Sequence, residues 1–527
     1  MKQIIFKNML FVCAFLFIGM AQAQTVSGTV SDSNGPLPGA NVAVKGTNIG
    51  AISDFDGEYT LENVPSDAVL VFSFVGYITQ EVAVNGRSTI NITLNEDASS
   101  LDEVVVIGYG TQSIKDATGA VSVVTADEFN KGVISSPEQL IQGKSAGVQI
   151  TQSSGEPGAG IQVRIRGTAS VRSNNNPLFV VDGVPLSGED TSAGGADIGA
   201  GSSSARNPLN FLNPNDIESI SILKDASATA IYGSRGANGV VIITTKTGRA
   251  GAGGVFEFSS SVSYSTPAER FDLLNREEYL SAVAQYGGDV DALDYGANTD
   301  WQDEVLRNTF SHNQSLAYSN NYGSGNVRAS FSYGDQLGIV ENSEQEKITG
   351  RLNLSQRFFE DKLKVDFNGT ISRVNDLAPL ISNNSGSTGD LLGAAYFANP
   401  TWPTNLDFTT GGGGELIPSQ VLAYYKDLAH TDRYLANISG EYSILPNLKA
   451  KATLGFDESS SEKSQSLSGL ITGVTNGTPS NGRGSFGALY TKNTLFDLTL
   501  NYTKEFENSN FEALIGYSYQ SFLRKGK

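Results

Sequence analysis

From residue 255 onward, apolar and polar side chains alternate along the chain in segments of about ten residues. The alternation is clearest in residues 256–264, 362–371, 448–456 and 496–502. Because successive side chains of a β-strand point to opposite faces, each segment predicts a strand with one apolar and one polar face. Nine or ten such strands are expected. A transmembrane barrel with lipid outside and water inside has this pattern, but so does a soluble sandwich.

The lengths of the connections favour the barrel. Short and longer connections alternate strictly, and outer-membrane barrels place short turns on the periplasmic side and long loops outside. A soluble sandwich has no reason to sort its loops in this way. The short connections are expected at 322–325, 360–361, 445–447 and 505–510, and the longer ones at 265–308, 336–346, 375–431 and 459–483.

Residues 25–94 have the pattern of a small β-sandwich. Short apolar stretches at 41–44, 69–74 and 89–94 are separated by turn signals that are rich in glycine, proline and aspartate. One of these signals, Asp54-x-Asp56-Gly57, predicts a hairpin turn rather than a calcium loop, because the later oxygen ligands of such a loop are missing.

Residues 118–248 predict a mixed α/β domain. Asp182-Gly183 is the signal of a tight hairpin. Asp225 is expected to cap a helix that ends near Gly233. Two further short helices are expected at 126–131 and 137–142, and strands at 147–152, 161–167, 178–185, 216–223 and 240–246.

A short β-prone segment, Leu101–Gln112 (LDEVVVIGYGTQ), lies between these two domains. An apolar strand in a linker is suited to pairing with the sheet edge of another protein, where backbone hydrogen bonds provide the affinity. An ordinary strand of a neighbouring domain is the alternative.

The first residues have the pattern of a secretory leader. Lys2 and Lys7 precede the apolar run 9–20, and Ala21-Gln22-Ala23 is a small-x-small cleavage site. The chain's one cysteine, Cys13, lies inside this run, so a disulfide scaffold and a thiolate site are excluded from the mature protein. The net charge of −19 argues against nucleic-acid binding. The 58 glycines, 20 tyrosines and 26 phenylalanines fit a large β protein.

The sequence contains little that indicates catalysis. Only two histidines are present, His312 and His430, and neither predicts a metal cluster or a catalytic triad. Gly143-Lys144-Ser145 lacks the earlier glycine of a phosphate-binding loop. We therefore expect no enzyme, no metal and no cofactor. Trp301 and Trp402 are candidates for stacking on sugar rings or, with more weight, for a membrane girdle.

Three motifs resemble the SusC/RagA-type TonB-dependent outer-membrane transporters. They are Leu101–Gln112, Val181–Pro185 (VDGVP) and the long, specific segment Asp216–Gly248. The N-terminal sandwich resembles the carboxypeptidase-regulatory-like β domain that precedes many of these transporters. The motif residues that the resemblance marks as plug positions are Asp182, Gly183, Asp216, Lys224, Asp225, Tyr232, Gly233, Arg235, Gly236 and Gly239.

The resemblance implies a plug domain inside a barrel of 22 strands in the outer membrane of a Gram-negative cell. It also implies a TonB box that pairs with the periplasmic domain of TonB. The implied partner is a SusD-like surface lipoprotein, and the implied substrates are oligosaccharides or peptides. The expected TonB box consists of Asp102, Glu103, Val104, Val105, Val106 and Ile107.

The expected fold is therefore mainly β, with five parts. They are a signal peptide (1–23), a β-sandwich (24–97), a linker with the TonB box (98–117), a plug (118–248) and a partial transmembrane barrel (249–527). Nine or ten strands are about half of such a barrel, so an N-terminal fragment of a longer protein is expected. The alternatives to import are a TonB-dependent signalling receptor, a siderophore or cofactor receptor, and a secreted adhesin. The all-β first domain and the absence of internal repeats favour import.

Overall fold

The computed structural model describes residues 23–32, 35–45, 47, 49–74, 77, 79–94, 104–107, 110–113, 120–168, 175–187, 190–194, 198, 205–248, 254–381, 390–405, 416–471, 481–506 and 509–527. The expected leader, except for its last residue, and Asp102 and Glu103 lie outside them. The chain divides into two compact units, one of residues 1–105 and 112–116 and the other of residues 106–111 and 117–527.

The N-terminal domain is a sandwich of two small sheets, with strand orders β4-β1-β7 and β3-β2-β5-β6. Val26, Leu61, Leu70 and Phe72 are at most 1% exposed and form the centre of its core. The strands are β1 (Ala23–Ser31), β2 (Asn41–Val44), β3 (Gly50–Ile52), β4 (Glu58–Pro65), β5 (Val69–Ser73), β6 (Gln80–Ala83) and β7 (Ile92–Thr93).

The Asp54–Glu58 segment is a tight turn, as expected, but it is not a hairpin, because it joins β3 and β4, which lie in different sheets. The Asp54 carboxylate accepts hydrogen bonds from the N–H groups of Asp56 (3.0 Å) and Glu58 (2.8 Å). Gly57 has a φ of +72°, and a Cβ at this position would lie 2.5 Å from the Val30 carbonyl oxygen. The turn therefore requires glycine here for both conformation and space.

In the linker, β8 (Val104–Ile107) pairs with β9 (Gly110–Ser113) in a two-stranded sheet. The mixed domain (residues 120–248) follows, with a five-stranded sheet of order β10-β15-β16-β13-β14 and a separate β11–β12 hairpin. Its elements are β10 (Val121–Thr125), α2 (Pro137–Leu140), β11 (Val148–Gln152), β12 (Ile161–Ile165), β13 (Leu178–Val181), β14 (Val184–Pro185), η1 (Pro214–Asp216), β15 (Ile217–Leu223), α3 (Ala226–Thr229), η2 (Ala230–Asn238) and β16 (Val240–Thr245).

The prediction of a helix at 126–131 is wrong. The chain makes a single turn there, closed by the Glu128 N–H to the Thr125 carbonyl (3.0 Å). The Asn130 N–H then binds the Leu140 carbonyl (2.9 Å) at the end of α2. Hydrogen bonds to a distant segment have replaced the local bonds that a helix would need.

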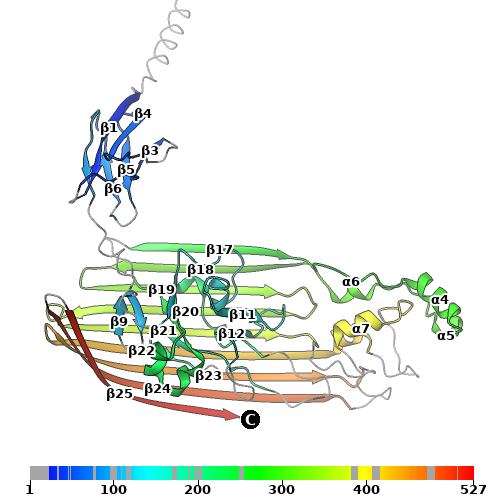
Figure 1. The fold of residues 1–527 in the computed structure, drawn as a ribbon. Helices are drawn as coiled ribbons and strands as arrows, with labels where there is room; N and C mark the ends of the chain where they lie inside the picture. The colour runs from blue at the N-terminus through cyan, green and yellow to red at the C-terminus, as the bar shows by residue number, and fades with distance from the viewer. Residues whose placement is uncertain are drawn as a thin grey trace, which may run out of the picture. The chain divides into compact units, whose positions relative to one another are not determined.

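Nine long strands form one antiparallel sheet in sequence order from β17 to β25, which we call the wall (Figure 1). The strand number agrees with the sequence pattern, and the turns fall where short connections were expected. The strands are β17 (Val255–Ser265), β18 (Thr309–Asn321), β19 (Gly325–Leu337), β20 (Glu344–Phe358), β21 (Leu363–Leu377), β22 (Tyr425–Leu445), β23 (Leu448–Leu467), β24 (Arg483–Phe506) and β25 (Ser509–Gly526).

The described parts of the long connections contain five helices, and the last three of them share a hydrophobic core. Trp301 and Trp402 are 2% and 6% exposed in this core, and the Trp301 indole N–H donates to the Asn399 carbonyl (3.0 Å). Both tryptophans are therefore core residues, and neither the stacking nor the girdle expectation holds. The helices are α4 (Arg276–Gln285), α5 (Val290–Leu293), α6 (Trp301–Val305), α7 (Leu391–Phe397) and α8 (Pro418–Tyr424).

The two faces of the wall differ as the alternation predicts. Phe258, Phe331 and Ile371 are 71%, 55% and 61% exposed on one face, whereas Ser330 and Thr370 are buried on the other. Among the described residues, no helix is both long enough and apolar enough to cross a bilayer.

We predict that Gly57→Ala destabilises the isolated N-terminal domain by about 2 kcal/mol, because a left-handed residue with a side chain costs roughly 1–2 kcal/mol and the Val30 carbonyl must also move. Gly86→Ala is the matched control. Gly86 has the same φ of +72°, but nothing lies within 4 Å of its Cβ position. Urea unfolding of both variants measures the difference, and equal losses of stability would show that the Val30 contact is unimportant.

Candidate functional site

Several of the motif residues, Asp182 among them, lie at the interface between the mixed domain and the wall. Asp182 and Gly183 form the tight turn between β13 and β14, with φ values of +46° and +86°. This turn confirms the predicted hairpin. The Asp182 carboxylate accepts hydrogen bonds from the Thr245 N–H (3.0 Å) and hydroxyl (3.0 and 3.1 Å), which tie the turn to the end of β16.

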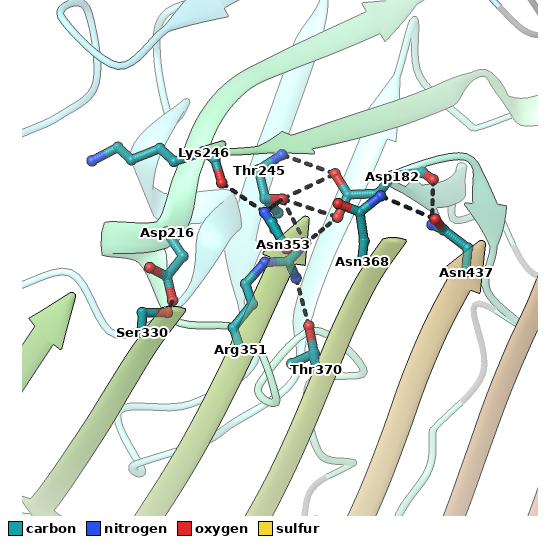
Figure 2. Close-up of polar contacts among 10 residues, drawn as sticks. All are labelled: Asp182, Asp216, Thr245, Lys246, Ser330, Arg351, Asn353, Asn368, Thr370 and Asn437. Atoms are coloured by element: carbon teal, nitrogen blue, oxygen red, sulfur yellow. Dashed lines mark hydrogen bonds and ion pairs between the residues drawn. The ribbon is translucent and has the colours of Figure 1, made fainter. Parts of the chain in front are cut away.

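The same carboxylate forms a buried ion pair with Arg351 on β20 of the wall (Figure 2). The Arg351 and Asp182 side chains are only 4% and 9% exposed. Arg351 also donates to the hydroxyls of Thr370 and Thr245, both at 2.5 Å. Removing one partner of such a pair leaves an uncompensated buried charge, whereas the pair as a whole contributes little net stability.

Amide side chains of the wall complete this cluster. Asn353 donates to the Lys246 carbonyl (2.6 Å) and to the Thr245 hydroxyl (3.2 Å). Asn437 donates to the Asp182 carbonyl (2.7 Å) and accepts from Asn368 (3.0 Å). Figure 2 shows these amides around the Asp182 turn, which β20 and β22 hold directly, while Asn368 of β21 bonds to Asn437.

A second buried ion pair lies at Asp216, the last residue of η1. Its carboxylate accepts from the Ser330 hydroxyl (2.7 Å) and pairs with Arg328 on β19 at 3.5 Å. Both charged side chains are 5–6% exposed. Arg328 also donates to the Ser319 hydroxyl (2.8 Å) and to Glu257 (3.0 Å). The two motif aspartates are thus both held by arginines of the wall.

Two more wall cations contact the mixed domain. Lys347 donates to the carbonyls of Ser135 (3.4 Å) and Leu212 (3.3 Å). Arg433 is paired with Asp457 of the wall and donates to the Pro208 carbonyl (2.7 Å). Its guanidinium carbon also lies 4.1 Å from the centre of the Phe211 ring, a cation–π contact.

Sequence reasoning missed these four cations. The signal was present, because each occupies a polar-face position within an alternating strand. The polar face of a strand does not say what it meets, so the partners were not predictable.

One buried carboxylate of the mixed domain is only partly satisfied. Glu138 is 3% exposed and accepts one hydrogen bond from the Asn207 amide (3.1 Å), while its Oε1 has no partner. Burial raises the pKa of the Glu138 carboxyl above its usual range.

Asp225 does not cap its helix. It occupies the position before α3, but its side chain makes no capping hydrogen bond. The carboxylate instead accepts from the Ala120 N–H (2.6 Å) and pairs with Arg166. The Ala120 N–H, and next the Arg166 guanidinium, hold the pKa of the Asp225 carboxyl below its usual range. This contribution to stability is present at neutral pH and is lost as the pH falls through the lowered pKa.

The first helical segment ends at Gly233, as expected, and a second short segment follows it. Gly233 is a kink with φ +60° and ψ −145°, a conformation that only glycine adopts readily, and the second segment continues to Asn238. The end of the second segment is at Gly239, with φ +90°, where a Cβ would lie 2.6 Å from Ile165 Cδ1. Gly236 is equally restricted, because its Cβ would lie 2.8 Å from the Thr229 carbonyl oxygen.

The two large motif residues of this segment pack against other parts of the unit. The Arg235 guanidinium lies over the Phe522 ring of β25 at 5.2 Å, and Tyr232 packs against the apolar cluster around Leu178 and Ile242. Of the expected TonB-box residues, Val104–Ile107 form β8, while Asp102 and Glu103 lie outside the described residues.

The ion pairs and hydrogen bonds of this interface hold the mixed domain on the wall. In the described part of the chain, no group of three or more histidine, cysteine or acidic residues could hold a metal ion. His430 binds Asn375 (2.6 Å) and Asp432 (3.3 Å) through its two ring nitrogens. A polar hollow of about 420 Å³ lies beside Asp182 and is lined in part by Asp366, Lys449 and Lys451.

Two domain families match the chain. Residues 26–106 match the CarboxypepD_reg-like domain, and residues 113–240 match the TonB-dependent Receptor Plug Domain. The chain is 34% identical to the TonB-dependent receptor SusC of Bacteroides thetaiotaomicron, a match that covers 99% of this chain and 53% of that protein. The TonB-dependent receptor P3 of Formosa agariphila is 36% identical, with 100% and 50% covered.

The chain belongs to the SusC-type TonB-dependent receptors. The fold agrees, because the RagAB peptide importer in the 'open-open' state superposes with a TM-score of 0.66 at 23% identity, over 80% of this chain and 49% of that one. The chain spans about half the length of the curated relatives that it matches. Those relatives are named as receptors rather than enzymes, in agreement with the sequence prediction.

We predict that Arg351→Met destabilises the docking of the plug on the wall by about 3–5 kcal/mol, because Asp182 is left charged and buried. Arg373→Met is the matched control. Its ion pair with Asp432 joins two wall strands, and Arg373 is 54% exposed; exposed pairs contribute about 0–1 kcal/mol. Urea unfolding of the purified protein in detergent compares the two.

A double variant, Arg351→Met with Asp182→Asn, is expected to recover most of the loss, since no unpaired charge remains. If the double variant is as unstable as Arg351→Met alone, the effect comes from packing and not from the buried charge.

Proposed function

We propose that the protein imports oligosaccharides or peptides across the outer membrane of a Gram-negative cell, using energy delivered by TonB. The observation that carries this proposal is the buried contact between plug and wall. The Asp182 and Asp216 carboxylates are held by arginines that are at most 5% exposed. A plug fastened in this way does not leave its position without an input of energy, because both charges would have to be separated.

The all-β first domain supports import over signalling. Residues 26–94 form two small β-sheets around one apolar core, without the mixed βα pattern of the modules that signalling receptors carry. The substrate class is supported by the relatives alone: one is named SusC, and the RagAB structures are described as a peptide importer. A SusD-like surface lipoprotein is the partner that this family membership suggests.

Asp102–Ile107 is proposed as the TonB box. The β8 strand lies in this segment and pairs on one side with β9. A second strand edge can therefore receive a strand of TonB through backbone hydrogen bonds. The leader at residues 1–23 is proposed to direct export, and the wall is proposed to span the outer membrane as part of a barrel.

We predict that Val105→Pro abolishes uptake in cells that carry the complete gene, because proline removes a backbone donor from the added strand. Val104→Pro tests the opposite register, since N–H directions alternate along a strand. Labelled-substrate uptake is measured beside surface binding at matched protein levels.

Val105→Ile is the control and should transport normally, because the backbone rather than the side chain is recognised. Surface binding should survive in all three variants. Normal uptake by both proline variants would rule out energy coupling through this segment. Energy-dependent uptake of an iron chelate, with no binding of glycans or peptides, would favour the siderophore-receptor alternative.

A further inference from the structure

Lys224 and Asp225 hold three separate segments of the plug together. The Asp225 carboxylate accepts from the Ala120 N–H (2.6 Å) and pairs with Arg166, which follows β12. The Lys224 ammonium donates to the carbonyl of Ala146, just before β11, at 2.9 Å. The Lys224 backbone N–H donates to the Ala120 carbonyl (3.1 Å). Two neighbouring residues thus fasten the start of β10 and both ends of the β11–β12 hairpin.

This contact lies where the linker enters the plug. Ala120 immediately precedes β10, which is the edge strand of the five-stranded sheet and pairs only with β15. The paired residues of the two strands run from Val121↔Leu223 to Thr125↔Ser219. A pull on the linker therefore acts on the Ala120–Asp225 contact before it acts on any residue pair of β10 and β15.

The rest of the five-stranded sheet is held differently. The β13–β14 turn is fastened to the wall through Asp182, and the residue before β15 through Asp216. Within the described residues, the hydrogen bonds of β10 go only to other parts of the plug. The wall thus anchors the β13–β14 turn and the start of β15. Among the described residues, it forms no hydrogen bond with the edge strand β10.

The ion pair between Asp225 and Arg166 is also of a type that separates readily, because it is partly exposed to water. The Arg166 and Asp225 side chains are 52% and 31% exposed, in contrast to the buried pairs at the wall. Water can replace each partner of an exposed pair as it separates, so such pairs add little to overall stability. Local opening at this corner does not require the plug to leave the wall.

We infer that Lys224 and Asp225 form a clasp that opens first when the linker is pulled, releasing β10 while β13–β16 stay on the wall. The inference rests on the proposed function, because TonB supplies the pull. The clasp also explains why the side chain of Asp225 does not cap α3, although Asp225 occupies the position before this helix. Its carboxylate is turned from its own helix toward a strand 105 residues away in sequence.

Hydrogen exchange tests the clasp in the purified protein without TonB. In Asp225→Ala, the amides of β10 should exchange at least about tenfold faster, while those of β13 and β16 keep the wild-type rate. Glu218→Ala is the matched control, because it removes an exposed carboxylate from the adjacent β15 strand. Unchanged exchange at β10 in Asp225→Ala would overturn the clasp.

A disulfide tests the release of β10. Backbone bonds at Ala120–Lys224 and Ala126–Glu218 make Val123↔Ser221 a non-hydrogen-bonded pair. Cα atoms of such pairs lie roughly 4.5 Å apart, within the range of roughly 4.4–6.8 Å that disulfides span. Residues 24–527 contain no cysteine of their own, so within them Val123→Cys with Ser221→Cys forms a single defined bond.

The locked variant should bind substrate at the surface but lose uptake, and a reductant should restore it. Each single-cysteine variant should transport normally. Normal uptake with the disulfide formed would overturn the release of β10. Loss of TonB dependence in the wild type would instead overturn the proposed function, and the exchange experiment, which needs no transport, separates the two failures.

Discussion

The buried ion pair between Asp182 and Arg351 is the contact on which the position of the plug depends. An arginine and an aspartate that are less than a tenth exposed are tolerated only when each meets the other and further hydrogen bonds. Thr245 and Thr370 supply those bonds from two different strands, and Asn437 holds the backbone carbonyl of Asp182 from a third. The arrangement specifies one docked position, because a shifted plug would leave two charges buried without partners.

The wall can hold the plug in this position because its outward and inward faces carry different side chains. On β21 and β22, the outward face changes from Ile371 and Ile438 to Arg373 and Asp432 toward the long connections. A bilayer needs only about 9–11 residues of a tilted strand, and β24 has 24. The inward face holds the cations that contact the plug.

The plug is also joined to the long connections. Ile198 of the plug is buried in the core that the loop helices form, and the Arg483 side chain donates to its carbonyl (3.1 Å). The Ala193 N–H donates to the Ser461 hydroxyl (2.9 Å) on β23. These contacts join the plug to the loop core and to β23.

Local signals in the sequence determined the elements of this protein. Period-two alternation predicted the long strands, and Asp182-Gly183 predicted the hairpin, because both depend on residues that are close along the chain. The motif residues Asp182 and Asp216 were recognised, but their partners Arg351 and Arg328 lie 169 and 112 residues away. Only the tertiary structure decided those contacts. It also turned Asp225 from a helix cap into a partner of Ala120, and replaced the helix at 126–131 by a turn bonded to α2. A polar side chain takes the partner that burial brings to it, and burial is set by the whole fold rather than by its neighbours in sequence.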